Sequence, residues 1–146
     1  MVKLGLKPLK RNKRKYSSYK GTVGKIGKVT VEMMREQYGS EPKDILAAIG
    51  PSICQSCYEV SEDVIVQFRE AFDSSLWQEL FYAKENGKYQ LNLWRANELI
   101  FEEAGILREH YSTTNVCTCC NPGYLFSHRA SHGKRGNLGA FLQIKE

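Results

Sequence analysis

The sequence predicts an α/β domain in which helices cover a mixed sheet. In some segments apolar residues recur every three to four positions, the spacing of a helix that buries one face, and in others they form the short continuous runs typical of buried strands. The two patterns alternate along the chain, which indicates α/β organisation. The length of 146 residues, of which 42% are hydrophobic, corresponds to one globular domain.

The first half of the chain is expected to contain a helix, a strand and a second helix. The first helix covers residues 22–38, with Thr22 as its N-cap and Gly39 after its last residue. Residues 44–50 form a short apolar run that ends in Gly-Pro, which indicates a buried strand leading into a loop. The Ser-Glu-Asp sequence at residues 61–63 predicts the start of the second helix.

The second half is expected to contain one more helix and three strands. The helix covers residues 91–104, where the amphipathic spacing returns, and Gly105 ends it. The strands are expected near residues 107–111, 124–127 and 138–144. The first helix should pack on a sheet that contains residues 45–49 and 138–144, because the apolar period changes from helical to extended between these segments.

The positive charge is concentrated at the start of the chain. Residues 1–15 are basic, and the first 20 positions hold eight Lys or Arg residues and no acid, although the net charge of the whole chain is only +5. A basic segment on an acidic body can contact nucleic acid, but this one lacks the interleaved aromatic residues that stack on bases. A solvated, disordered segment is therefore the favoured interpretation, and nucleic-acid binding is the alternative.

The sequence contains neither a membrane-spanning run nor a secretory signal. No apolar stretch approaches the roughly 20 residues of a spanning helix, and the basic start is not followed by an apolar signal region. The five cysteines are odd in number and fall in two places, which indicates reduced thiols rather than a disulfide framework. We therefore expect a cytoplasmic protein.

Thiols and imidazoles that could bind a metal are concentrated in two parts of the sequence. They are Cys54, Cys57, Cys117, Cys119, Cys120, His128 and His132. Four of these ligands would suit tetrahedral zinc, but the spacing between the pairs does not fit a compact zinc finger, and the adjacent Cys119 and Cys120 cannot easily both face one ion. We expect the cysteines to be core or loop thiols that form no shared tetrahedral site; a zinc-binding module is the alternative.

Cations mark two segments that could bind an anion. Lys20 lies at the expected start of the first helix beside Thr22, where backbone N–H groups and a hydroxyl favour phosphate. Arg129, Lys134 and Arg135 flank a glycine-rich turn near the end of the chain, and arginine can bind phosphate through two parallel hydrogen bonds. Solvated surface charge is the alternative interpretation.

Three segments of the chain resemble motifs of the laccase-domain (YfiH-type) family. Residues 16–23, Tyr-Ser-Ser-Tyr-Lys-Gly-Thr-Val, resemble the motif H-x-G-W-[RK]-G-T/V. Residues 48–60 contain Ala-Ile-Gly-Pro-Ser-Ile and Cys-Tyr-Glu-Val, which resemble A-I-G-P-x-I…C-Y-E-V. Residues 117–129 contain Cys-Thr and Leu-Phe-Ser-His-Arg, which resemble C-T…F-F-S-Y/H-R. The order and spacing match over about residues 16–146, as the C-terminal half of such a domain.

The resemblance implies an α/β fold and a zinc or copper site made of two histidines and one cysteine. It also implies phosphorolysis of purine nucleosides, adenosine deamination or phenol oxidation, so a purine nucleoside and phosphate are the expected ligands. By its place in the motif, Arg129 is expected beside the active-site cleft as a substrate ligand, with Lys20 approaching the same anion from the other side. His128 either donates to that substrate or serves in packing.

The chain departs from the family pattern at the metal site. Tyr16 and Tyr19 stand where the motif has His and Trp, and the family's other two metal ligands lie upstream of the matching part. We therefore expect residues 16–146 to be a partial domain without the metal ligands, inactive alone, that associates with itself or with a complementing N-terminal half. Residues 1–15 do not resemble the family. A non-enzymatic zinc- or nucleic-acid-binding module is the alternative.

Overall fold

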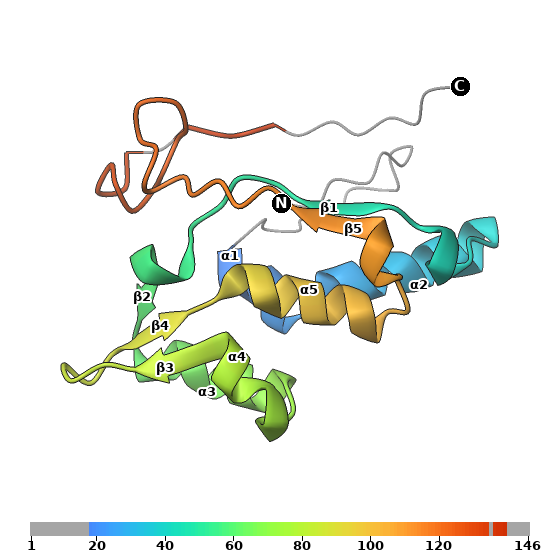
Figure 1. The fold of residues 1–146 in the computed structure, drawn as a ribbon, viewed down its shortest axis with the longest axis horizontal. Coiled ribbons are helices and arrows are strands. Elements are labelled where there is room, and N and C mark those ends of the chain that lie inside the picture. The colour runs from blue at the N-terminus through green and yellow to red at the C-terminus, as the bar shows by residue number, and fades with distance from the viewer. Residues whose placement is uncertain (1–17, 135, 140–146) are drawn as a thin grey trace.

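The structure, a computed structural model, describes residues 18–134 and 136–139 and confirms the predicted α/β class (Figure 1). The helices are α1 (Ser18–Val23), α2 (Ile26–Tyr38), α3 (Glu62–Ala71), α4 (Trp77–Leu80) and α5 (Leu93–Glu103). The strands are β1 (Ala47–Ile49), β2 (Glu59–Val60), β3 (Phe81–Ala83), β4 (Tyr89–Leu91) and β5 (Tyr111–Thr113). Short 3-10 turns lie at Pro42–Asp44, Gln55–Cys57, Ser74–Leu76 and Arg108–His110. Within the described residues, no helix combines the length and apolar character needed to cross a membrane.

The strands form two small sheets. In the first, β1 and β5 are parallel, with Ala47 opposite Tyr111. A bridge between Ser52 and Cys117 continues this parallel pairing beyond the strands. In the second sheet, β4 lies between β2 and β3 and is antiparallel to both. In the view of Figure 1, α5 runs between the two sheets.

Two clusters of buried apolar side chains form the core, and α5 contributes to both. In the larger cluster, Ile65 and Phe68 of α3 pack with Ala96 and Ile100 of α5. The smaller cluster joins α2 and α5 to the parallel strands through Val31, Ile45, Ile49, Phe101, Ile106 and Tyr111. Burial of one large apolar side chain contributes about 1.5–3 kcal/mol. The expected packing of the first helix on the strand at residues 45–49 is thus confirmed.

The first predicted helix is interrupted by a sharp break. Lys25 adopts a left-handed conformation with φ of 47°, and a Cβ atom on Gly24 would lie only 3.1 Å from the carbonyl oxygen of Lys20. Thr22 is not the expected N-cap but a buried residue inside α1, whose hydroxyl accepts a hydrogen bond from Asn97 Nδ2 at 3.2 Å. A break at one residue hardly alters the apolar spacing, so periodicity does not reveal it.

The later predicted helices are confirmed, and the strands are shorter than expected. The helix predicted from residues 61–63 is α3, and the one predicted at residues 91–104 is α5. Gly39 ends α2 in a left-handed conformation with φ of 66°, as expected for a helix C-terminus. The 3-10 turn Pro42–Asp44 overlaps the first residue of the run at 44–50, of which only Ala47–Ile49 form β1. The 3-10 turn Arg108–His110 delays β5 to the end of the run at 107–111.

The predicted strand at residues 124–127 is wrong, because this segment begins in a turn. The N–H groups of Tyr124 and Leu125 both donate to the carbonyl oxygen of Asn121, at 3.2 and 3.0 Å, and Tyr124 is 92% exposed. The sequence Asn-Pro-Gly at this point is itself a strong turn signal. Of the predicted strand at residues 138–144, the first two residues are described and belong to no strand, and the remainder lies outside the described residues.

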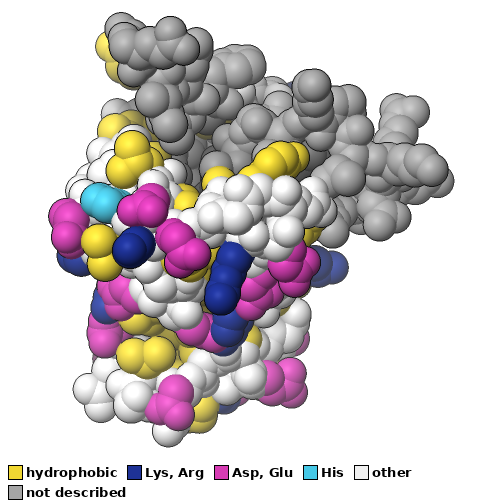
Figure 2. All heavy atoms as spheres, turned by 90° about the vertical axis from the view of Figure 1, so that its right-hand side faces the viewer, with side chains coloured by type: hydrophobic (Ala, Val, Ile, Leu, Met, Phe, Trp, Pro, Cys, Tyr) yellow, Lys and Arg dark blue, Asp and Glu magenta, His cyan; other side chains and the backbone are white. Residues whose placement is uncertain are grey.

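Charges of both signs are mixed on the face that Figure 2 shows. Ion pairs also connect separate helices. The Nζ atoms of Lys25 and Lys28, at the start of α2, lie 2.7 and 2.8 Å from the carboxylate oxygens of Glu103 in α5. Mixed charge creates no single-sign field of the kind that attracts nucleic acid. This face therefore does not support the nucleic-acid alternative. The basic segment at residues 1–15 lies outside the described residues.

Candidate functional site

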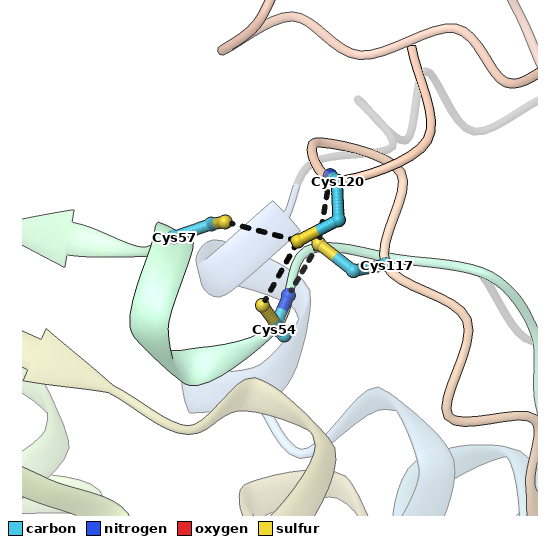
Figure 3. Close-up of side chains that lie close together, drawn as sticks. All are labelled: Cys54, Cys57, Cys117 and Cys120. Atoms are coloured by element: carbon cyan, nitrogen blue, oxygen red, sulfur yellow. Dashed lines mark hydrogen bonds between the residues drawn. The ribbon is translucent and has the colours of Figure 1, made fainter. Parts of the chain in front are cut away.

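Parallel pairing of β1 and β5 brings two distant loops together. Beyond the strands, the N–H of Ser52 donates to the carbonyl oxygen of Val116 at 3.2 Å, and the N–H of Thr118 donates to that of Ser52 at 3.1 Å. These bonds flank the bridge between Ser52 and Cys117. Because both segments run in the same direction, the cysteines that follow Ser52 lie beside those that begin at Cys117 (Figure 3).

Four cysteine sulfur atoms converge where these loops meet. The sulfur atoms of Cys54, Cys57, Cys117 and Cys120 all lie within 4.8 Å of one another (Figure 3). The Sγ atom of Cys120 is 3.5 Å from that of Cys57 and 3.9 Å from that of Cys54. We refer to these residues as the four-cysteine cluster. The expectation that the thiols do not come together in one site is therefore wrong.

Only one of the adjacent residues Cys119 and Cys120 belongs to the four-cysteine cluster. Cys119 is outside the four-cysteine cluster, and its neighbour Cys120 alone belongs to it. The participating residues are two Cys-x-x-Cys pairs: Cys54 with Cys57, and Cys117 with Cys120. This repeated spacing was a usable sequence signal. The sequence did not reveal the parallel pairing of β1 with β5, which brings the two Cys-x-x-Cys pairs together.

Cys117 is buried, at 5% exposure, and backbone N–H groups donate hydrogen bonds to its sulfur atom. The N–H of Cys54 donates to it at 3.3 Å and that of Cys120 at 3.4 Å. Burial opposes ionisation of Cys54, but hydrogen bonds with Ser56, Cys117 and Cys57 outweigh it and lower the pKa of the Cys54 thiol to about 6. Hydrogen bonding to Cys120 raises the pKa of the Cys57 thiol. The cluster thus combines thiols of different acidity.

The metal site that the family resemblance implies does not fit the described residues. Within the part of the chain that the structure describes, the four-cysteine cluster is the only group of three or more potential metal ligands. His110, His128 and His132 all lie outside it, so two histidines and a cysteine are not assembled there. Tyr16, which stands at the histidine position of the motif, lies outside the described residues. No step through that zinc or copper ion follows from these residues.

Arg129 is anchored on the segment that follows Cys57. Its Nη2 atom donates to the carbonyl oxygen of Glu59 at 3.0 Å, and its Cζ atom lies 5.7 Å from the centre of the Tyr58 ring. Tyr58 and Glu59 belong to one predicted family motif and Arg129 to another, so the fold brings the two motifs together. Arg129 is exposed, and it forms no ion pair within the described residues.

A hydrogen-bonded turn presents Arg129. Ser127 is buried, and its Oγ accepts a hydrogen bond from the N–H of Ala130 at 3.2 Å. The carbonyl oxygen of Ser127 accepts from the hydroxyl of Ser131 at 2.6 Å and from its N–H at 3.0 Å. Gly133, with φ of 93°, then reverses the chain in a conformation that glycine adopts without strain. The turn therefore fixes the backbone from which Arg129 projects.

The other predicted residues of this turn are exposed or undescribed. His128 is exposed, so its ring does not belong to the core. Lys134 is exposed as well, and Arg135 lies outside the described residues.

Lys20 lies in a different surrounding. It lines an open hollow of about 510 Å³ between α1 and α3, together with Glu70. Among the described residues that line this hollow, neither Arg129 nor His128 is present. Because Glu70 brings a negative charge to the same hollow, the hollow is less suitable for an anion than the sequence alone indicates. The convergence of Lys20 and Arg129 on one anion stays a prediction.

Comparison with known proteins gives consistent matches to one family. Residues 17–145 match the family described as multi-copper polyphenol oxidoreductase laccase. The chain is 37% identical over 131 residues to the purine nucleoside phosphorylase YlmD of Bacillus subtilis (strain 168), covering 90% of this chain and 46% of that protein. It is 34% identical over 114 residues to the adenosine deaminase RL5 of an unknown prokaryotic organism, covering 78% of this chain and 43% of that protein. The chain thus spans about half the length of the curated relatives it matches.

Solved structures agree with these matches. The Bacillus licheniformis hypothetical protein YfiH superposes with a TM-score of 0.75 at 33% identity, covering 82% of this chain and 45% of that one. YlmD from Geobacillus stearothermophilus gives a TM-score of 0.75 at 31% identity, covering 82% and 44%. The described fold is therefore that of one half of such a domain.

Proposed function

Because the chain belongs to the multi-copper polyphenol oxidoreductase laccase family, we propose that it takes part in the conversion of purine nucleosides, with phosphate as the second substrate. The similarity to purine nucleoside phosphorylase YlmD over 90% of the chain supports this substrate class. The similarity to adenosine deaminase RL5 supports a purine nucleoside as substrate as well, in a reaction where water and not phosphate is the second substrate. Both reactions start with recognition of a purine nucleoside.

The contact of Arg129 with Glu59 is the observation that carries the proposal. One N–H of the guanidinium is used to anchor the side chain on the Glu59 carbonyl. A guanidinium has five N–H donors in a planar fork, so an anchored arginine keeps donors for the oxygens of phosphate or ribose. The Tyr58 ring beneath it restricts the arginine further. Arg129 is therefore the proposed substrate ligand, and its role is to bind and orient the anion or sugar.

The proposed turnover of nucleosides needs residues other than those that the structure describes. A family metal would supply a Lewis acid or a metal-bound hydroxide, but the described residues assemble no two-histidine, one-cysteine site. We propose that nucleoside conversion also needs the counterpart of the segment of the relatives that this chain does not match. The free thiols of all five cysteines support a reducing compartment such as the cytoplasm.

A complementation assay tests the proposal. The chain is co-expressed with the unmatched segment of Bacillus subtilis YlmD, and phosphate-dependent release of purine base from inosine and adenosine is measured by chromatography. We expect base release from the pair and little or none from either chain alone. The positive control pairs the same segment with the matched segment of YlmD itself. Activity in that control without activity in the hybrid would argue against the proposal.

A further inference from the structure

We propose that the four-cysteine cluster binds one zinc ion through the thiolates of Cys54, Cys57, Cys117 and Cys120. The site is separate from the metal site implied by the family, because it contains four cysteines and no histidine. It does not depend on the proposed nucleoside chemistry. Thiolate sulfur is a preferred ligand of zinc, and structural zinc sites with four cysteines are tetrahedral and closed.

The distances between the sulfur atoms suit a single zinc ion. Zn–S bonds near 2.3 Å in a tetrahedron place the sulfur atoms roughly 3.8 Å apart. Cys120 is 3.5 Å from Cys57 and 3.9 Å from Cys54, and no pair among the four sulfur atoms exceeds 4.8 Å. Small side-chain rotations would bring the remaining pairs to the tetrahedral spacing. An iron–sulfur cluster needs more room, because several iron and sulfide ions must lie between the thiolates.

The backbone around the four-cysteine cluster supplies the hydrogen bonds that thiolates need. The two N–H groups that donate to Cys117 offset part of the negative charge that four thiolates leave on a divalent ion. Each pair also lies in a tight local structure. Cys57 donates its N–H to the carbonyl oxygen of Cys54 at 3.2 Å, and the Asn121 side chain donates to the carbonyl oxygen of Cys117 at 2.8 Å.

The zinc ion would join two loops that come from distant parts of the chain. The first loop follows β1 and leads to Tyr58 and Glu59, and the second follows β5 and leads to the turn that carries Arg129. Fixing the two loops to one ion keeps Glu59 in place beneath Arg129. The thiols must lose their protons to bind, so zinc uptake releases protons to the solvent.

Metal titration of the whole chain tests the site directly. The 146-residue protein is purified under reducing conditions, stripped of metal with a chelator, and titrated with Zn²⁺ in competition with a chromophoric chelator. We expect one tightly bound zinc per chain. Replacement by Co²⁺ should give the intense visible absorption and sulfur-to-cobalt charge-transfer bands of tetrahedral thiolate coordination. Binding of no zinc, or a weak cobalt spectrum typical of six oxygen or nitrogen ligands, would overturn the proposal even without any variant.

Serine variants assign the ligands. Cys120→Ser, at an exposed position, should reduce the intensity of the sulfur-to-cobalt charge-transfer bands, because one of four thiolates is lost, and weaken zinc binding at least tenfold. Cys119→Ser is the matched control, because Cys119 is the next residue and lies outside the four-cysteine cluster; it should leave both measurements unchanged. Equal loss in the two variants would overturn the assignment. So would a disulfide between Cys57 and Cys120 in the purified protein that persists in reductant and excludes zinc.

Discussion

The sulfur atoms of Cys57 and Cys120 lie 3.5 Å apart although 63 residues separate them in the chain. Parallel pairing of β1 with β5 explains the contact, since it carries the two loops that follow the strands in the same direction. Cys57 ends the 3-10 turn Gln55–Cys57, and Cys120 lies in a turn that follows β5. The cluster therefore links two segments that lie far apart in the sequence.

Zinc should stabilise the folded chain measurably. A ligand that binds only the folded state, at a free concentration 100 times its Kd, adds about 2.7 kcal/mol of stability. For a chain of this size that corresponds to a rise of several degrees in the unfolding midpoint. Thermal unfolding followed by circular dichroism, with zinc and then with excess chelator, measures the shift. We expect the full shift in the wild type and in Cys119→Ser, and a clearly smaller shift in Cys120→Ser at the same free zinc concentration. An identical shift in all three would contradict a specific site.

Arg129 should matter for nucleoside turnover and not for folding. In the complemented protein, Arg129→Ala removes a charged hydrogen bond of about 1.5–3 kcal/mol, so kcat/KM for inosine should fall by roughly tenfold or more. Arg129→Lys should restore activity only in part, because lysine lacks the planar fork. Arg35→Ala, at an exposed position near the end of α2, is the control and should retain activity. Full activity in the Arg129→Ala protein would refute the assignment.

The larger core cluster should depend strongly on α3. Phe68 is fully buried, at 0% exposure, and its ring stacks with that of Phe72 at a centroid distance of 5.8 Å. Phe68→Ala should lower the free energy of unfolding by about 3–5 kcal/mol, because it removes a large buried side chain and leaves a cavity. Urea denaturation measures this value. Val66 lies on the same helix and is 41% exposed, so Val66→Ala should change the stability by less than about 1 kcal/mol.

Apolar periodicity and glycine positions were sufficient to locate α2, α3 and α5. Each of these helices buries one face, and the apolar residues of that face recur every three to four positions, as Ile65 and Phe68 do; Ile100 lies on the buried face of α5. The left-handed Lys25 that divides the first helix has no such signature, since lysine is not a residue type that favours this conformation. The strands were overestimated because the predicted segments overlap 3-10 turns, at Asp44 and at Arg108–His110, whose backbone is not extended.

The candidate site was predictable in its residues and not in its geometry. Arg129 and the cysteines stood out by chemical type, and the two Cys-x-x-Cys spacings were present in the sequence. Their convergence depends on the pairing of β1 with β5, a contact between distant segments that local spacing does not encode. The second pair was harder to identify, because Cys117, Cys119 and Cys120 lie within four residues. The sequence alone does not show which two of these three cysteines form the pair.

Glu59 should make stability depend on pH in the acid range. Hydrogen bonds from Lys84 and Asn86 lower the pKa of the Glu59 carboxyl to about 2, from an ordinary value of 4.5. Because the pKa of Glu59 is lower in the folded state than in the unfolded state, the ionised carboxylate stabilises the fold. This contribution to stability is fully present above about pH 4.5. It is lost progressively as the pH falls through about 2.

Comparison of Glu59→Gln with the wild type isolates this effect. At near-neutral pH the wild type should have the higher urea midpoint, and the difference should shrink steadily below about pH 4.5 and vanish near pH 2. Glu85→Gln is the matched control, because Glu85 is exposed beside Lys84 and forms no ion pair within the described residues. Its difference from the wild type should not follow the same course. A Glu59→Gln difference that stays constant from neutral pH to pH 2 would show that the Lys84 pair does not stabilise the fold.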